Sequence, residues 1–315
     1  MTAIHLRMVF CYTVFVWSPK FRTMSYQLIG NISALICDDG IEPLAHATLR
    51  IYLPPIQAAP QPAVHGIFSE PRPLSAATVA EKADRLLVET PLDVDGNFRV
   101  SWNEIHLFTE PLEIDICIDN IAGARRTLPV PLHFSLGVLT PHWRRSKERY
   151  LAAFAYIVPS DCWSNIRHQL QCWAITGVLR HFRSHAPIPR VLVQAYNARN
   201  GKKLGEAFAN EQGRFRMQFP FEPQHRHLLL VRNGEIRTGP DVFFKVLTAE
   251  GFVLWSEDRS AGLRDDRQCV AACSKQDILV KPSPVLKSMM PLSGWRQLVQ
   301  IARLRRRYME HYSFV

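Results

Sequence analysis

The amino-acid sequence predicts an all-β protein built from two similar halves, and three observations lead to this prediction. First, Phe215, Met217 and Phe219 alternate with polar residues. That period of two is typical of a strand with one buried face and one solvated face. Second, Gly213 precedes this run and supplies the positive φ angle that a tight hairpin needs. Third, the same arrangement occurs earlier in the chain, around Gly96.

The earlier arrangement extends over three segments, each of which has a counterpart in the second half. Residues 28–32 match 174–178, residues 43–52 match 187–196, and residues 93–102 match 210–219. In the last pair the phase of alternation also agrees, because Phe98 corresponds to Phe215. An internal repeat of this kind decides the fold that a sequence predicts. The first half is longer between its second and third segments, and we interpret the surplus as an insertion, which a loop accommodates at small entropic cost.

The matching segments resemble the carboxypeptidase regulatory-like, or transthyretin-like, β-sandwich domain. The resemblance lies in the pattern P-L-x-x-A-x-L-x-I-Y at residues 43–52 and the pattern D-x-D-G-x-F-x-V at residues 93–100, and it covers both halves of the chain. It implies a seven-stranded sandwich in each half and, usually, a non-catalytic accessory, adhesion or assembly module. The predicted fold is therefore two tandem transthyretin-like (prealbumin-like) β-sandwiches joined by a helix, with a further helix at the C-terminus.

Five parts are expected along the chain. They are an N-terminal extension or a mis-assigned start over residues 1–25, a first β-sandwich over 26–158 with an inserted loop and helix near 54–85, a linker helix over 159–173, a second β-sandwich over 174–282, and a basic C-terminal helix over 283–315. The linker helix is predicted from the helical spacing of Trp163, Ile166, Leu170 and Trp173. The inserted helix is predicted from the capping-box pattern T-x-x-E at residues 78–81.

The composition indicates an ordinary globular protein with a basic surface. Hydrophobic residues make up 47% of the 315 residues and charged residues 21%, a balance that argues against disorder. The net charge of +10 favours acidic partners such as acidic proteins, nucleic acid or anionic surfaces. The seven cysteines include no C-x-x-C motif, so we expect mostly buried thiols rather than a disulfide scaffold or a zinc ribbon.

The N-terminal residues permit two interpretations. Residues 8–17 form an apolar run after Arg7, which is long enough for the hydrophobic part of a secretion signal and too short to cross a bilayer. No small-x-small cleavage motif follows, and Met24 stands directly before the first predicted strand. We therefore favour a cytoplasmic location over secretion and expect no membrane span.

One pattern is compatible with a metal centre. His225 and His227 alternate, so both imidazoles face the same side of a strand, and Tyr196 lies on a neighbouring predicted strand. Intradiol dioxygenases, which share the architecture that the resemblance implies, hold iron with two tyrosines and two histidines. A second tyrosine with the spacing of that family is lacking, so we expect no metal and no cofactor, and keep a metal-dependent enzyme as the alternative. The sequence contains no G-x-S-x-G, phosphate-loop, dinucleotide or H-E-x-x-H motif.

Two basic and aromatic segments are the candidate binding elements. Residues 142–150 either contact a phosphate backbone by charge and stacking or form a solvated loop between the domains. Residues 294–312 are predicted to form a helix, and four of the five residues 303–307 are arginine, which pairs with carboxylates and phosphates alike. The partner-binding candidates are Trp143, Arg144, Arg145, Trp295, Arg303, Arg305, Arg306, Arg307, Tyr308 and Tyr312.

These features predict a non-catalytic module for protein binding or assembly, whose partner is a protein with an acidic surface. Nucleic acid is the second candidate partner. Recognition of carbohydrate or of a cell surface is a further alternative, and it would require export. The identity of the partner and the oligomeric state do not follow from the sequence.

Overall fold

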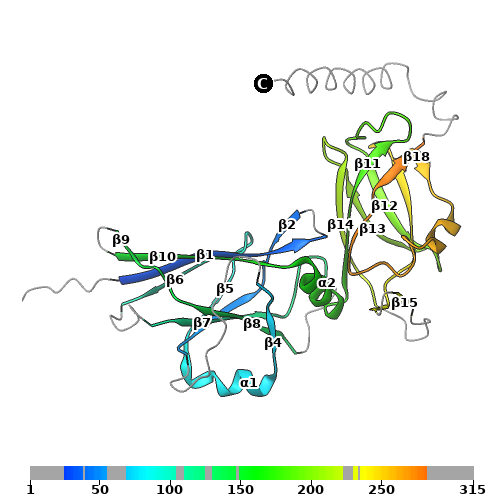
Figure 1. The fold of residues 1–315 in the computed structure, drawn as a ribbon. Coiled ribbons are helices and arrows are strands. Elements are labelled where there is room, and N and C mark those ends of the chain that lie inside the picture. Colours follow the sequence, from blue (N-terminus) through cyan, green and yellow to red (C-terminus); the bar gives the residue numbers. More distant parts are fainter. Residues whose placement is uncertain are drawn as a thin grey trace, which may run out of the picture.

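The structure, a computed structural model, describes residues 25–37, 40–54, 69–103, 110–124, 130–146, 149–222, 230–232 and 235–281, and only the backbone of those between 230 and 237. This part of the chain is predominantly β and consists of β-sandwich domains, which confirms the all-β prediction. Figure 1 shows two bodies, the first in blue to green and the second in green to orange, with a short helix where they meet.

The first sandwich packs two sheets against each other. One contains β1 (Ser25–Ile36), β2 (Gly40–Pro43), β6 (Asn97–Trp102), β9 (Arg144–Ser146) and β10 (Arg149–Val158). The other contains, side by side in this order, β4 (Arg72–Leu74), β8 (Leu132–Leu139), β7 (Leu112–Ile118), β3 (Thr48–Tyr52) and β5 (Leu86–Pro91). The helix α1 (Ala76–Glu81) and the 3₁₀ helix η1 (Ala83–Arg85) belong to the connection between β3 and β5.

Among the described residues, the second sandwich has two four-stranded sheets, whereas the first has two five-stranded sheets. One sheet contains β14 (Arg214–Pro220), β11 (Cys172–His181), β19 (Cys273–Lys275) and β20 (Ile278–Val280). The other contains β13 (Lys203–Phe208), β12 (Leu192–Asn197), β17 (Val242–Leu247) and β18 (Val253–Ser256). A separate hairpin is formed by β15 (Leu230–Arg232) and β16 (Glu235–Arg237), and the 3₁₀ helix η3 (Arg259–Leu263) follows β18.

The same strand pairing occurs in both sandwiches. β1 pairs antiparallel with β6 and parallel with β10, and β11 pairs antiparallel with β14 and parallel with β19 and β20. In the opposite sheets β3 lies between β5 and β7, and β12 lies between β13 and β17. β8 and β18 then pair with the other edges of β7 and β17, and in the first sandwich β4 follows beyond β8.

Two glycines occupy equivalent hairpin turns in this pattern. The carbonyl of Gly96 accepts a hydrogen bond from Ile32 N at 2.9 Å, and that of Gly213 accepts one from Leu179 N at 2.8 Å. Their φ angles are +75° and +73°, and a Cβ added to either would lie 2.4 Å from Ile32 O or 2.6 Å from Leu179 O. Only glycine fits such a close approach with a positive φ.

The register of the first matching segment differs by one residue from the predicted one. Gly30 corresponds to Gly177 rather than to Thr176, because Gly30 pairs with Phe98 and Gly177 pairs with Phe215. At both glycines the space of a Cβ is already filled by a phenylalanine ring and a carbonyl oxygen, which belongs to Phe154 of β10 at Gly30 and to Gln276, just after β19, at Gly177. A one-residue shift would turn every side chain of the strand to the other face of its sheet.

The helix between the sandwiches is shorter than predicted. α2 (Ser160–Gln169) ends before Gln171, which has a φ angle of +51°, and Trp173 belongs to β11, where it pairs with Phe219. The prediction of one apolar helical stripe was therefore wrong for Trp173. Trp163 and Ile166 pack into the core of the first sandwich, whereas Trp173 packs into the core of the second.

The inserted helix begins earlier than the capping-box pattern predicted. Ser75 is its N-cap, and its hydroxyl accepts a hydrogen bond from Thr78 N at 3.1 Å. Thr78 therefore lies inside the first turn of α1 and does not cap it. The pattern identified the helix but not its first residue, because serine and threonine are both good N-caps.

Candidate interaction surface

The basic segment at residues 142–150 lies at one end of the first sandwich and not between the domains. Arg144 and Arg145 belong to β9, and Arg145 pairs with Tyr150 at the start of β10. The interpretation as an interdomain loop was wrong, because these residues form a hairpin at the end of the sheet that is remote from the second sandwich (Figure 1).

Three aromatic rings support this hairpin. The ring of Tyr26, which is 3% exposed, stacks on Tyr150 with centroids 5.0 Å apart, and Trp143 meets it edge-on at 5.3 Å. Burial, followed by the neighbouring Tyr150, raises the pKa of Tyr26. Trp102 lies opposite Tyr26 on β6. Each such ring pair contributes about 0.5–1.5 kcal/mol beyond its burial, so Trp143 acts mainly as a fixed support for β9.

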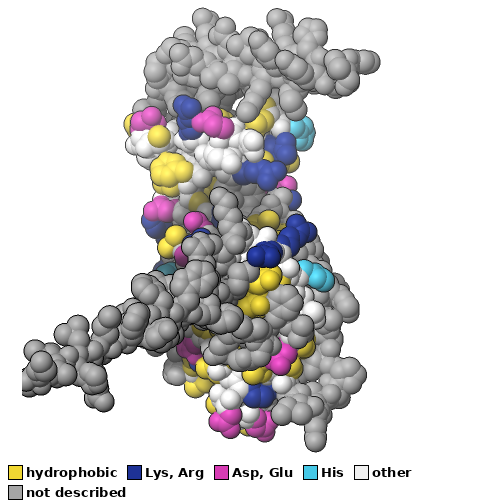
Figure 2. Space-filling view, turned by 90° about the vertical axis from the view of Figure 1, so that its left-hand side faces the viewer, with side chains coloured by type: hydrophobic (Ala, Val, Ile, Leu, Met, Phe, Trp, Pro, Cys, Tyr) yellow, Lys and Arg dark blue, Asp and Glu magenta, His cyan; other side chains and the backbone are white. Residues whose placement is uncertain are grey.

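Arg144 and Arg145 are exposed on this support. Within the part of the chain that the structure describes, no carboxylate pairs with either guanidinium. The nearby Arg149 donates a hydrogen bond to Gln27 Oε1 at 3.2 Å. Figure 2 looks onto this side of the molecule and shows Lys and Arg side chains next to hydrophobic ones and a histidine. We call Tyr26, Trp143, Arg144, Arg145 and Tyr150 the end surface.

The other candidate site residues fall into two groups. Those outside the described residues are His225, His227, Trp295, Arg303, Arg305, Arg306, Arg307, Tyr308 and Tyr312. Tyr196 is described: its hydroxyl donates to Gln194 Oε1 at 2.9 Å, and Lys245 Nζ lies 4.6 Å from its ring. That ammonium disfavours a metal cation at the same position. Among the described residues no three His, Cys, Asp or Glu side chains gather in a metal-binding group.

The two sandwiches meet at a buried ionic cluster that we call the junction. Glu42 on β2 is 4% exposed, and its carboxylate accepts hydrogen bonds from Arg167 Nη1 at 3.0 and 3.2 Å. Trp163 Nε1 at 3.1 Å and Gln218 Nε2 at 2.8 Å donate to the same carboxylate, and Arg216 pairs with it at 3.1 Å. The cluster connects the first sandwich, α2 and β14 of the second sandwich.

Sequence patterns did not indicate this junction. Arg167 lies among polar residues of α2, which predicts exposure, yet it is fully buried. Glu42 lies on a short strand next to exposed Ile41. A buried charge is costly unless it is paired and hydrogen-bonded, so each of the two residues requires the other. They are 125 positions apart, and only the tertiary structure brings them together.

The described cysteines are all free thiols, in line with the absence of a C-x-x-C motif. Cys37, Cys117, Cys172 and Cys269 are buried. Burial raises the pKa of Cys117, Cys172 and Cys269, which keeps these thiols protonated at neutral pH.

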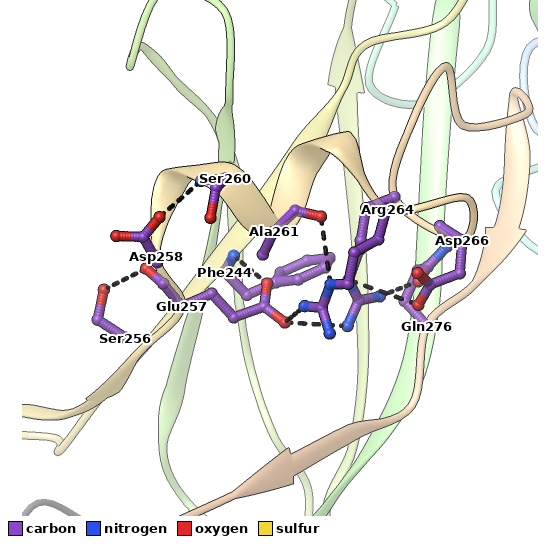
Figure 3. Close-up of polar contacts among 10 residues, drawn as sticks. Phe244, Ser256, Glu257, Asp258, Ser260, Ala261, Arg264, Asp266 and Gln276 are labelled. Atoms are coloured by element: carbon purple, nitrogen blue, oxygen red, sulfur yellow. Dashed lines mark hydrogen bonds and ion pairs between the residues drawn. The ribbon is translucent and has the colours of Figure 1, made fainter.

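A second ionic cluster lies beside the first residues of β17, which β18 does not pair. Glu257 accepts from Arg264 Nη2 at 2.8 Å and from Arg267 Nη2 at 3.3 Å, and its other oxygen accepts from Phe244 N at 2.9 Å. Figure 3 shows the Glu257 carboxylate facing these groups beside the ring of Phe244. Arg267 also bonds Gln276. Both arginines pair with Glu257, so we interpret this cluster as structural.

A third cluster lies between the insertion and β7. Lys82 Nζ is 2.7 Å from Glu113 Oε1 and 2.8 Å from Asp115 Oδ2, and Arg85 is 3.2 Å from the other oxygen of Glu113. Only 6% of the Lys82 side chain is exposed, and the two acidic side chains are still more buried.

The described surface has at least two hollows. A shallow groove of about 990 Å³ runs over β1, β6 and β10 and is lined by Asn31, Asp93, Asn97, Arg99 and apolar residues. A smaller one, of about 330 Å³, lies between the sandwiches beside Arg214 and Arg216. Neither places a nucleophile next to a base. In the described part of the chain, no helix has the length and apolar character needed to cross a membrane.

Comparison with known proteins identifies no family. No family model and no curated protein matches the chain. Solved structures that align over most of it include the Bacillus anthracis TIE protein, with 12% identity over 82% of this chain and 34% of that protein at a TM-score of 0.23. The shaft pilin SpaA from Lactobacillus rhamnosus GG aligns with 10% identity over 82% of this chain and 98% of that protein at a TM-score of 0.26. A streptococcal ancillary pilin aligns with 8% identity over 83% and 63% at 0.22. Likenesses this weak identify neither a family nor a function.

Proposed function

We propose that this chain is a non-catalytic module that binds a protein with an acidic surface inside a larger assembly, and that the end surface is a contact site. The observation that carries the proposal is the pair of exposed arginines, Arg144 and Arg145, held on a rigid aromatic base. Arginine and aromatic residues dominate interface energetics, and a preorganised surface loses less entropy on binding.

The architecture supports a structural role. The junction fixes one sandwich against the other through β2, α2 and β14, so the end surface is held at a constant distance from the second sandwich. The shared strand pairing and the equivalent turns at Gly96 and Gly213 lead us to interpret the two halves as tandem carboxypeptidase regulatory-like, or transthyretin-like, domains. Modules of that kind usually serve adhesion or assembly.

The proposal is tested by affinity capture from native lysate with the full chain and with an Arg144→Ala/Arg145→Ala variant. We expect the variant to lose most of the captured partner and to melt like the full chain. The matched control is Arg183→Ala/Lys202→Ala, which removes two exposed cations from the second sandwich. Equal loss in both variants would show that net charge, and not the end surface, is responsible.

The basic C-terminal segment is the second proposed contact. Deleting residues 293–315 is expected to leave the cooperative melt intact and to weaken capture. If the partner is nucleic acid, capture should fall steeply with salt, because phosphate contacts release counterions. A protein partner gives a shallower dependence, since salt screens exposed charges most. Unchanged capture by the truncated chain would remove this segment from the proposal.

A further inference from the structure

Lys82, Glu113 and Asp115 form a group unlike the other ion pairs of the described chain. Glu113 and Asp115 are alternate residues of β7, so both leave the sheet on the face opposite its core. The insertion covers this face, and Lys82, at the end of α1, reaches both carboxyl groups from it. One amine therefore touches two acids inside the protein.

Neighbouring buried residues shield Lys82, Glu113 and Asp115 from water. Tyr52, 2% exposed, lies opposite Glu113 on β3, and its ring centroid is 5.5 Å from Lys82 Nζ. Ser135 lies opposite Asp115 on β8 and is 3% exposed. In such a setting a pair of opposite charges retains little of the hydration that stabilises it in water.

The two acids differ in their ionisation. Burial is the main cause of the raised pKa of Asp115, which favours its protonated carboxylic acid form. Burial also opposes ionisation of Glu113, but hydrogen bonds and charges from Lys82 and Arg85 outweigh it and lower the pKa of Glu113. The cluster thus combines an acid whose pKa is raised with a carboxylate whose pKa is lowered.

From this geometry we propose that Lys82 and Asp115 condense to form an amide bond between their side chains. Transfer of one proton from the Lys82 ammonium to Asp115 produces a neutral amine and a neutral carboxylic acid in contact. Amines and acids do not condense readily in water, because there they exchange this proton and separate as hydrated ions. Burial opposes both the ionisation and the separation.

The bond forms in two steps, and Glu113 serves as proton carrier. Lys82 Nζ attacks the carboxyl carbon of Asp115, a C–N bond forms, and Glu113 accepts a proton from the nitrogen. Glu113 then returns that proton to a hydroxyl oxygen of Asp115, the C–O bond breaks, and water leaves. The sum is one amine and one acid converted to one amide and one water, with no oxidant or reductant.

Another lysine–glutamate contact in the molecule serves as an internal reference. Lys203 Nζ lies 3.1 Å from Glu206 Oε2, but 46% and 42% of their side chains are exposed. This pair has the same functional groups at a similar distance, yet water solvates both and no second carboxylate touches the amine. It is expected to remain an ordinary ion pair.

The test is the mass of the purified full chain after denaturation. We expect a mass lower than that of the sequence by one water molecule, and a branched peptide after proteolysis that joins Lys82 to Asp115. The peptides containing Lys203 and Glu206 should be unlinked. A wild-type chain with the full mass of its sequence and no branched peptide would overturn the proposal.

Two variants test the chemistry. Lys82→Arg should retain the full mass, because a guanidinium does not attack the acid. Glu113→Gln keeps the amine and the acid but removes the proton acceptor, so it should retain the full mass or lose water far more slowly. Condensation of Glu113→Gln at the wild-type rate would overturn the role of Glu113. Each variant is first shown by a cooperative melt to be folded, because an unfolded chain would retain the full mass whatever the role of the substituted residue.

Discussion

The two sandwiches share a backbone frame and differ in where they bury charge. The frame is the pairing of β1 with β6 and β10 in the first and of β11 with β14, β19 and β20 in the second, closed by turns at Gly96 and Gly213. In the first sandwich the buried charges lie between β7 and the insertion before β5. In the second, where β12 and β13 are joined by a short turn, the buried pair of Glu257 and Arg267 comes from the residues before and after η3.

This difference shows that the frame and the charged clusters depend on different residues of the sequence. The frame depends on glycines and alternating apolar residues, which recur in both halves. Each of the two clusters has at least one charged member on a connection, Lys82 in the first sandwich and Arg267 in the second, and connections change length without disturbing a sheet. The junction belongs to neither sandwich alone, because its members come from β2, α2 and β14.

The largest expected effect is at the junction. Glu42→Gln leaves the fully buried Arg167 without a counter-charge, which should lower the free energy of unfolding by about 3–5 kcal/mol. Denaturant titration measures it. Glu89→Gln is the control, because Glu89 forms a partly exposed pair with Arg50 at 2.8 Å, and such pairs contribute about 0–1 kcal/mol. Equal losses in the two variants would mean that the junction does not hold the sandwiches together.

Alanine at the two hairpin glycines tests whether the frame is the same in both halves. Gly96→Ala and Gly213→Ala should each destabilise by more than about 2 kcal/mol, since a positive φ alone costs about 1–2 kcal/mol in an L-residue and a carbonyl oxygen fills the Cβ position. Gly201→Ala is the control: its φ angle is +71°, but nothing lies within 4 Å of the added Cβ. Thermal melts should show two similar large shifts and one smaller shift. A large effect at only one of the hairpin glycines would contradict the equivalence of the turns.

Substitutions at two helix N-caps test the connections in which the two sandwiches differ. Ser75→Ala and Asp258→Ala each remove a side-chain acceptor, from Thr78 N in α1 and from Ser260 N in η3. Each should cost about 1 kcal/mol. The free energy of unfolding from denaturant titration provides the measurement. If Ser75→Ala has no effect, the insertion does not fold together with the sheet that it covers.

The smallest expected effect is a pH dependence of stability that arises from His168 on α2. His168 Nε2 lies 2.7 Å from Thr238 Oγ1, and burial lowers the pKa of His168 below its ordinary value of 6.5. The folded state therefore holds this histidine neutral at a pH where the unfolded chain protonates it. Its contribution is complete above pH 6.5 and is lost as the pH falls through the folded pKa, by about 1 kcal/mol or less. The difference in stability between wild type and His168→Gln, measured from pH 7.5 to 5, isolates this effect from the other histidines. A constant difference would exclude it.

The sequence alone determined the strands and the repeated frame. Alternation at Phe98 and Phe215, and glycines before them, are local signals, because a strand with one buried face requires a period of two and a tight turn requires a positive φ. The register of Gly30 was misjudged by one residue, since its need for glycine arises from a ring and a carbonyl on neighbouring strands. Trp173 was wrongly assigned to a helix because of its helical spacing to Leu170. Its true place in β11 depends on pairing with Phe219, which is distant in the sequence.

Only the tertiary structure decided which charges are buried. Glu42 and Arg167, or Lys82 and Asp115, look like surface residues in the sequence, because nothing local distinguishes a solvated charge from a paired one. Burial of such a charge is favourable only when its partner arrives from another element, and the identity of that partner depends on how the sheets and connections pack. The exposure of Arg144 and Arg145 was decided in the same way, by the stacking of Tyr26, Trp143 and Tyr150 beneath β9.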